Sequence, residues 1–137
     1  SASLDDLPFS LDSKAWQGGA PILGAFDTDR KLGAFLGDNL EATIVTQEFG
    51  DTAGGVTRTT RLYPVVDTID VAVSIGQRFR RSDAVTWLSE QSQSYNTGQV
   101  RKRSRSRFHR FKVRIPAGTT WAHFSGVDVD FEPAGSR

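Results

Sequence analysis

The chain has 137 residues, of which 37% are hydrophobic and 24% are charged, as in ordinary globular proteins. This length fits one domain with one sizeable core, and no apolar run approaches the roughly 18 residues that span a bilayer. The sequence contains no cysteine, which excludes disulfides, thiolate nucleophiles and thiolate metal sites. It also contains no methionine, so either an initiator was removed before Ser1 or, as we favour, the chain is an excised segment of a longer polypeptide. Because no apolar run could span a bilayer, we expect no membrane partner.

The net charge is only +1, but the charges are unevenly distributed along the chain. Residues 1–57 contain nine acidic and three basic residues, whereas residues 91–122 contain no acidic residue. The sequence therefore predicts an acidic N-terminal half and a basic C-terminal stripe. The stripe consists of Arg101, Lys102, Arg103, Arg105, Arg107, Arg110, Lys112 and Arg114.

Residues 1–19 contain large apolar side chains but lack the regular alternation of a strand. We expect an extended N-terminal arm that buries these side chains on a neighbouring surface, in its own chain or in another. Phe9 and Trp16 are the candidate anchors of this assembly interface, because aromatic residues dominate the centres of interfaces. Residues 20–137 would then form a single β domain.

The rest of the chain shows a period of two, which is typical of β-strands. The alternation is weak over residues 42–46, gives way to a β-branched run over 56–63, and is clear over 71–75, 111–115 and 127–131. Turn-forming residues separate these runs, and we find no internal repeat. The pattern predicts an all-β fold, an antiparallel β-sandwich or a barrel-like domain.

Residues 82–91 come closest to a helical pattern, with Ser82 or Asp83 available to cap the N-terminus. The same segment also fits a strand that contains Val85 and Trp87. Both interpretations stay open at this stage.

The basic stretch Arg101–Arg107, which includes Lys102, is the main candidate site. On one extended strand Arg101, Arg103, Arg105 and Arg107 would share a face and present a ridge of guanidinium groups to an anionic partner. Nucleic acid is one such partner, because clustered arginines neutralise phosphates and nearby aromatic residues stack on bases. We favour the alternative of solvation or contact with an acidic protein surface, because the chain's own N-terminal half is acidic.

The later basic residues have a simpler interpretation, because the strand that ends at Ile115 can pair with the strand that begins near Phe124. A single antiparallel register then places three opposite charges across from one another, and the apolar residues share the other face. The expected pairs are Arg114 with Asp128, Lys112 with Asp130, and Arg110 with Glu132.

Metal and catalytic motifs are missing from the sequence. His109 and His123 lack a second ligand at a metal-binding spacing, so we expect each to form hydrogen bonds at a strand end. Residues 27–33 share two aspartates and a glycine with calcium loops, but a turn between strands is the simpler interpretation. Carboxylates within residues 5–12 could form a glycosidase pair only through folding. We expect no catalytic residue, cofactor or metal.

Several short motifs resemble those of tailed-bacteriophage virion proteins, and they cover most of the chain. Similar proteins belong to the tail or to the head-to-tail connection, and include packaged-DNA stabilisation and hub proteins. The stretch from Arg101 to Arg107 is more basic than in that group. The motifs are Leu7–Ser13, Trp16–Gly19, Ala25–Phe35, Arg107–Phe111, Ile115–Trp121, Gly126–Val129 and Gly135–Arg137.

This resemblance implies a non-enzymatic structural component of a phage virion, assembled in the bacterial cytoplasm. Its partners would be symmetry-related copies of itself and other virion proteins. The alternative is a nucleic-acid-binding module that uses the stretch Arg101–Arg107. A third hypothesis, carbohydrate recognition, would place Trp16, Trp87 or Trp121 in a shallow groove.

Overall fold

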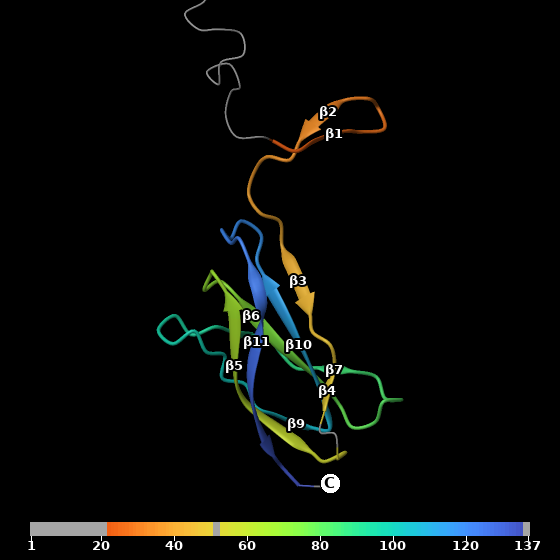
Figure 1. The fold of residues 1–137 in the computed structure, drawn as a ribbon, viewed down its shortest axis with the longest axis vertical. Helices are drawn as coiled ribbons and strands as arrows, with labels where there is room; N and C mark the ends of the chain where they lie inside the picture. The colour runs from red at the N-terminus through yellow and green to blue at the C-terminus, as the bar shows by residue number, and fades with distance from the viewer. Residues whose placement is uncertain (1–21, 51–52, 136–137) are drawn as a thin grey trace, which may run out of the picture. The chain divides into compact units, whose positions relative to one another are not determined.

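The computed structural model describes residues 22–50 and 53–135, which form two units divided after Gly37. All regular elements in these ranges are β-strands, and every strand pairing is antiparallel, so the predicted all-β class is confirmed (Figure 1). Within these ranges there is no helix long and apolar enough to cross a membrane. Phe9, Trp16 and the expected boundary after residue 19 lie outside the described residues.

The first unit contains a hairpin of two short strands, β1 (Gly24–Phe26) and β2 (Leu32–Ala34). Asp27 closes the turn, because its Oδ1 accepts hydrogen bonds from the backbone N–H groups of Asp29 at 2.9 Å and Lys31 at 2.8 Å. Arg30 takes a positive φ of 63°, as one residue of a tight turn often does. The predicted turn between strands is therefore confirmed for this segment.

The second unit contains a six-stranded sheet whose main path runs β3 (Ala42–Val45), β10 (Phe108–Ile115), β6 (Ala72–Arg78) and β7 (Thr86–Trp87). β4 (Phe49–Gly50) also pairs with β10, and β8 (Gln91–Ser92) also pairs with β6. The helical interpretation of residues 82–91 is thus wrong, and the strand interpretation is confirmed for Trp87 but not for Val85, which lies just before β7. The segment pairs because Trp87 lies opposite Gly76, whose missing side chain leaves room for the indole.

A three-stranded sheet lies opposite, in the order β11 (Phe124–Pro133), β5 (Thr57–Val66) and β9 (Ser104–Ser106). Its long β5–β11 pair contains two register shifts, which leave Thr60 as an extra residue in β5 and Ser125 as one in β11. Such bulges re-aim the side chains that follow them. The two sheets do not close on each other, so the fold is sandwich-like.

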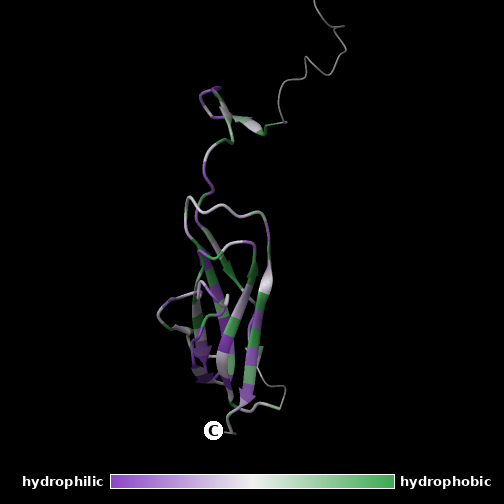
Figure 2. Ribbon diagram, turned by 90° about the vertical axis from the view of Figure 1, so that its left-hand side faces the viewer, coloured by the Kyte–Doolittle hydropathy of each residue, from purple (hydrophilic) through white to green (hydrophobic). Residues whose placement is uncertain are grey.

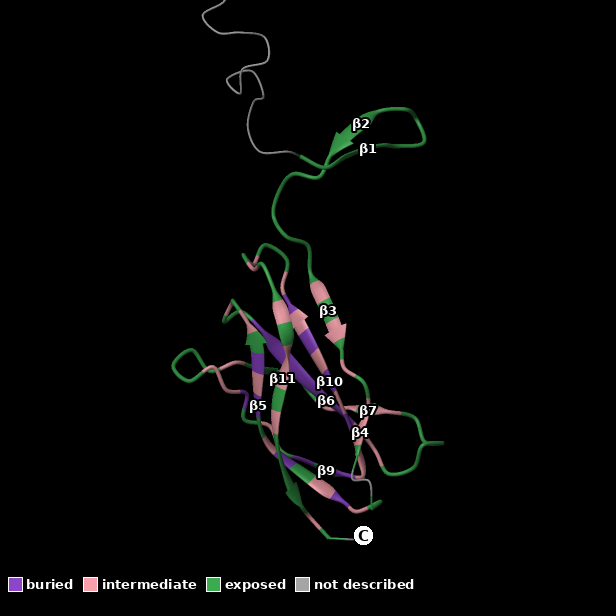
Figure 3. Ribbon diagram, in the orientation of Figure 1, coloured by how far each residue is buried: buried purple, intermediate pink, exposed green. Residues whose placement is uncertain are grey.

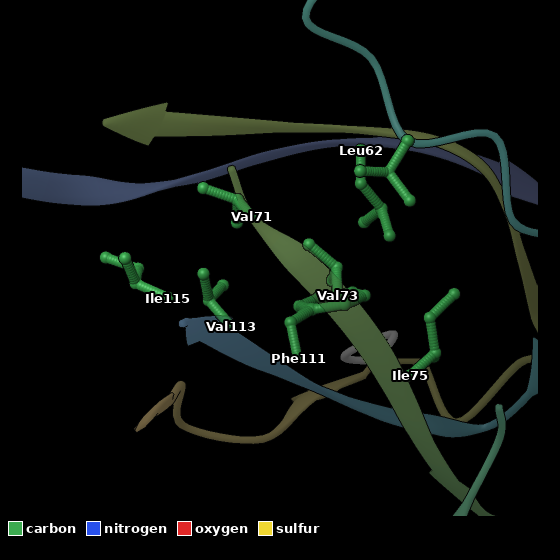
Figure 4. Packing of buried hydrophobic residues seen from close by; sticks show 8 residues of the cluster. Leu62, Val71, Val73, Ile75, Phe111, Val113 and Ile115 are labelled. Atoms are coloured by element: carbon green, nitrogen blue, oxygen red, sulfur yellow. The ribbon is translucent and has the colours of Figure 1, made fainter. Parts of the chain in front are cut away.

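The core lies between the two sheets and is fully apolar at its centre. On β10 the side chains alternate between buried and half-buried, which confirms the period-two prediction for this strand (Figure 3). Its buried side chains and those of β6 face Leu62 of β5 across the core (Figure 4). The buried cluster consists of Leu62, Val71, Val73, Ile75, Val100, Phe111, Val113 and Ile115.

The predicted pairing of β10 with β11 is wrong. β10 already has β6 on one edge and β3 and β4 on the other, so neither edge is left for β11. The intervening segment 116–123 carries the chain across to the other sheet, where β11 pairs with β5. Val127 and Val129 still pack on the same core as β10, but they do so from the opposite sheet.

The charged residues of β10 and β11 consequently have other partners. Glu132 forms a salt bridge with Arg58 of β5, and Asp130 lies 3.7 Å from Arg61 on the same strand. Arg114 instead binds Glu90 at 2.9 Å and Glu41 at 3.5 Å. Lys112 places its ammonium 4.1 Å from the ring centroid of Trp87.

Candidate interaction surfaces

The hairpin unit exposes an unusual amount of apolar surface. We call residues 22–36 the apolar hairpin, because its strands are hydrophobic and only its turn is hydrophilic (Figure 2). Its large apolar side chains are 59% to 74% exposed, and none of them is buried. They are Ile22, Leu23, Phe26, Leu32, Phe35 and Leu36.

The apolar hairpin has no polar face, which follows from a short repeat in its sequence. The tetrapeptide Leu-Gly-Ala-Phe occurs at residues 23–26 and again at 32–35, contrary to our finding of no repeat. Its two copies pair antiparallel, so Phe26 lies opposite Leu32 while Leu23 and Phe35 are joined by a backbone hydrogen bond of 2.8 Å. Because side chains alternate along a strand, each face of the hairpin carries one Leu–Phe pair.

Small residues between the Leu–Phe pairs leave both faces of the hairpin shallow. A Cβ added to Gly33 would meet only the carbonyl oxygen of Ala25, at an ordinary 3.8 Å. The hairpin itself therefore does not need a glycine at this position. A glycine with space around it lets the backbone of another element approach closely.

The open edge of the sandwich carries a second apolar surface. A pocket of about 400 Å³ lies there, within the ~300–1,000 Å³ range of pockets that bind small molecules. We call it the edge pocket. Residues from both sheets line it: Phe49, Gly50, Thr57, Phe131, Glu132 and Pro133.

Aromatic rings connect the edge pocket to the core. Phe131 is 42% exposed, and its ring centroid lies 6.5 Å from that of Phe49 and 6.3 Å from that of the fully buried Phe111. These distances fall within the range of favourable aromatic pairs. The base of the pocket is thus formed by packed aromatic rings.

A partly buried ion pair holds β4 beside this pocket. Arg78 donates two hydrogen bonds to the Glu48 carboxylate, at 2.6 Å and 2.8 Å, and also donates to the carbonyl of Arg81 at 2.6 Å. The hydrogen bond from Arg78 lowers the pKa of Glu48 below its ordinary value. This bidentate pair fixes the residue that precedes Phe49 in the chain.

His109 lies fully buried behind the pocket, 5.9 Å from the ring of Phe131 between centroids. Its Nδ1 is 3.3 Å from the Thr57 hydroxyl, so the predicted hydrogen bond at a strand end is confirmed for this histidine. Burial lowers the pKa of His109 below its ordinary value, because a buried imidazolium would lose its hydration. The imidazole is therefore neutral at pH 7.

The basic stretch forms only part of the predicted ridge. Ser104 and Ser106 point inward and donate hydrogen bonds to the Gln77 side chain at 2.7 Å and to the Arg78 carbonyl at 2.6 Å. Arg105 points outward between them and donates to the carbonyl of Ala134 at 3.1 Å.

The flanking bases divide between two environments. Lys102 turns to the Ser89 hydroxyl at 2.7 Å, and Arg107 is half-buried rather than exposed. Arg101 and Arg103 are exposed, and they line a groove of about 600 Å³ that we call the basic groove. Its other lining residues are Thr60, Arg61 and Glu132.

Acidic residues of β11 offset part of this positive charge. The register places Arg58 of β5 between Glu132 and Arg105, so one row across the sheet holds an acid and two bases. The salt bridge to Arg58, together with the nearby charge of Arg103, lowers the pKa of Glu132. An anion in the basic groove would therefore meet Glu132 as well as the arginines.

The remaining sequence candidates have structural partners. Trp87 covers Gly76, and Trp121 is half-buried against the core. His123 is exposed, with its Nδ1 3.7 Å from Asp67. In residues 22–50 and 53–135, no cluster of three or more His, Asp or Glu side chains could hold a metal ion.

Comparisons with known proteins add no identification. No protein family model matches the sequence, and no curated protein matches it significantly. The fold and its exposed surfaces are therefore the basis for a functional proposal.

Proposed function

We propose that the chain is a non-enzymatic structural component of a symmetric assembly, in the tail or connector of a phage virion. The exposed apolar hairpin carries this proposal. Its six large side chains, each at least 59% exposed, present on the order of 700 Å² of apolar surface. Divided between the two faces of the hairpin, this is on the order of 350 Å² on each face, within the range of about 300–600 Å² of the largest apolar patch on a typical monomer, which is often functional.

The hairpin also needs a partner for its own stability. Two short strands form a marginal structure in water unless they pack against something else. Burial of its apolar surface at an interface supplies that packing, and a stable interface commonly takes about 800 Å² from each partner. The proposed role explains why the chain keeps a two-faced apolar hairpin outside its core.

The virion part of the proposal is supported by the sequence motifs that resemble phage virion proteins. These motifs include Ile115–Trp121, which crosses from one sheet to the other, and Gly126–Val129 in β11. The stretch Ala25–Phe35 of the same resemblance lies within the apolar hairpin. One of the motifs that resemble phage virion proteins therefore coincides with the exposed apolar hairpin.

Sedimentation velocity tests the proposal on three proteins. We expect the wild-type protein to sediment as a closed oligomer and the double variant Phe26→Ser/Phe35→Ser, with one change on each hairpin face, to sediment as a monomer. Tyr95→Ser is the matched control, because Tyr95 is 81% exposed but belongs to a loop of the sandwich. A wild-type monomer at all concentrations, or a double variant that assembles normally, would contradict the proposal.

Nucleic-acid binding is a second candidate function, and the basic groove is the observation that favours it. Arg61, Arg101 and Arg103 line this groove, although Glu132 and the acidic residues of β11 weaken its field. Fluorescence anisotropy with labelled duplex DNA separates the two candidates. Binding that falls steeply between about 50 and 200 mM salt, and is lost in Arg101→Ser/Arg103→Ser, would favour this second function.

A further inference from the structure

We propose that the outer edge of β11, the edge that faces away from β5, binds an extended segment of another protein in which apolar residues alternate with lysine or arginine. β11 is the last strand of its sheet, and of the described strands only β5 pairs with it. It has ten residues, whereas strands most often have about five to six. Because this surface is separate from the apolar hairpin, the inference goes beyond the proposed function and can be tested independently of it.

The backbone of β11 presents hydrogen-bonding groups to this outer edge at its odd-numbered residues. Leu62 of β5 exchanges its backbone hydrogen bonds with Val100, at 3.0 Å and 2.8 Å, so Val129, its register partner on β11, directs its own groups away from β5. At the end of the strand, the N–H of Ala134 donates to the carbonyl of Val56 at 2.8 Å, so the even-numbered residues face β5. Such a row of outward groups is a template on which another strand can pair.

The inner face of β11 favours apolar residues on the added strand. Residues directly opposite each other in an antiparallel pair share a face of the sheet, so the residue across from Phe131 points toward the edge pocket, which Phe49 and Pro133 also line. A cavity of roughly 150 Å³ holds a benzene molecule, so this pocket of about 400 Å³ has room for one large apolar side chain. Val127 and Val129 are only half-buried on the same face, and apolar neighbours would cover them.

The outer face of β11 carries a row of acids, which favours basic residues between the apolar ones. Asp128, Asp130 and Glu132 alternate along the strand and are exposed. β5 supplies bases from its side, with Arg58 beside Glu132 and Arg61 3.7 Å from Asp130. A lysine or arginine on the outer side would place a base on both sides of each acid, and opposite charges across paired strands are stabilising. An acidic segment or a phosphate backbone would instead meet this row with like charge.

These 137 residues do not offer such a segment in an available form. Their clearest alternation of basic and apolar residues is Arg110–Ile115 in β10, and both edges of β10 are already paired, with β6 on one side and with β3 and β4 on the other. Residues 1–19 contain three acids and only one base, so they would meet the acidic row of β11 with like charge. The segment is therefore assigned to a different protein.

Synthetic peptides test the contact on the intact chain by isothermal titration calorimetry. The probe is a nine-residue peptide that alternates apolar residues with lysine, with phenylalanine at its centre and valine at the other apolar positions. We expect it to bind at least tenfold more tightly than the same peptide with glutamate in place of lysine. The variant Asp128→Lys/Asp130→Lys should reverse this preference.

N-methylated peptides provide the matched control for backbone pairing. The N–H groups of the apolar residues would face β11, and those of the lysines would face away. N-methylation of the apolar residues should therefore weaken binding at least tenfold, whereas N-methylation of the lysines should leave it nearly unchanged. Equal losses for the two N-methylated peptides, or equal binding of the lysine and glutamate peptides, would overturn the inference.

Hydrogen exchange measured by NMR locates the peptide on the protein. The amides of Val127, Val129 and Phe131 should become protected only when the lysine peptide binds, whereas those of Asp128 and Asp130 should be protected with and without it. Protection of the odd-numbered amides by self-association alone would overturn the inference and assign the edge to a second copy. Protection of the same amides by duplex DNA would overturn it as well.

The double variant Phe26→Ser/Phe35→Ser separates this inference from the proposed function. We expect this variant to bind the lysine peptide as tightly as the wild type does, because the hairpin and the edge of β11 are different surfaces. A lysine peptide that fails to bind either protein refutes the inference alone, whereas a monomeric wild-type protein refutes the proposed function alone.

Discussion

Replacement of Gly76 by alanine should destabilise the sandwich, although a glycine in a strand usually loses more conformational entropy on folding than an alanine does. A Cβ at this position would lie 2.7 Å from a methyl of Val85 and 2.9 Å from the ring of Trp87. Real Cβ atoms essentially never come so close to other heavy atoms. The β7 segment must therefore move away from β6, or the indole must leave its position.

The magnitude follows from the cost of overpacking, which is typically about 1–3 kcal/mol. With a urea m-value of about 1–3 kcal/mol/M, a loss of about 2 kcal/mol lowers the unfolding midpoint by roughly 1 M. Trp87 reports the transition by fluorescence, because its ring lies over the substituted residue. Its emission should also shift in the folded state of the variant.

Gly33→Ala is the matched control for this experiment. Gly33 is also a strand glycine, but an added Cβ would meet only one atom, at 3.8 Å. We expect its urea midpoint to equal that of the wild type. An unchanged midpoint and unchanged tryptophan emission in Gly76→Ala would refute the described packing of β7 on β6.

Two further predictions concern residues behind the edge pocket. The buried His109 is neutral in the folded state and has a lowered pKa, so the unfolded chain binds more protons below its ordinary pKa of 6.5, and stability should fall as the pH drops through that value. Urea midpoints at pH 7.5 and 5.5 measure this loss, and His109→Gln should show a smaller pH dependence; an equal dependence would contradict the assignment. Glu48 has a lowered pKa in the folded state, so its pair with Arg78 stabilises the protein above the ordinary pKa of 4.5, and this contribution disappears as the pH falls through the lower folded value. Glu48→Gln should therefore unfold at lower urea than the wild type at pH 7 but not in strong acid, and a gap of the same size at both pH values would contradict the prediction.

The sequence predicted strands better than it predicted their partners. The alternation over residues 111–115 identified the buried face of β10, because that face depends only on the strand itself. The partner of β11 was predicted from charge complementarity, and charge complementarity does not select a single partner strand here. Asp130 can be matched equally well with Lys112 or with Arg61, and the apolar residues of β11 reach the same core from either sheet.

The most exposed candidate surface was missed for a related physical reason. A period of two requires one polar face, and the apolar hairpin has none, so its strands left no alternation to detect. Glycine and alanine also separate its large apolar residues, so the segment contains no continuous run of large apolar side chains. The signal that was present is the repeated tetrapeptide at 23–26 and 32–35, whose two copies lie on either side of the turn formed by residues 27–31.

The candidate basic site could be predicted only in part. Strand alternation correctly placed Arg105 on the outer face of β9, next to the outward-facing Arg58 of β5. The diversion of Lys102 to Ser89 depends on a segment 13 residues earlier in the chain, which sequence spacing does not reveal. The salt bridge between Arg58 and Glu132 likewise needs the three-dimensional order of the strands.

Hydrogen exchange at the hairpin tests the central claim, that this surface is covered in an assembly, most directly. The backbone amides of residues 24–26 and 32–34 should exchange slowly in the assembled protein and quickly after dilution to monomers, while the amides of β6 and β10 stay protected in both states. Fast exchange of the hairpin amides at every protein concentration would contradict the claim.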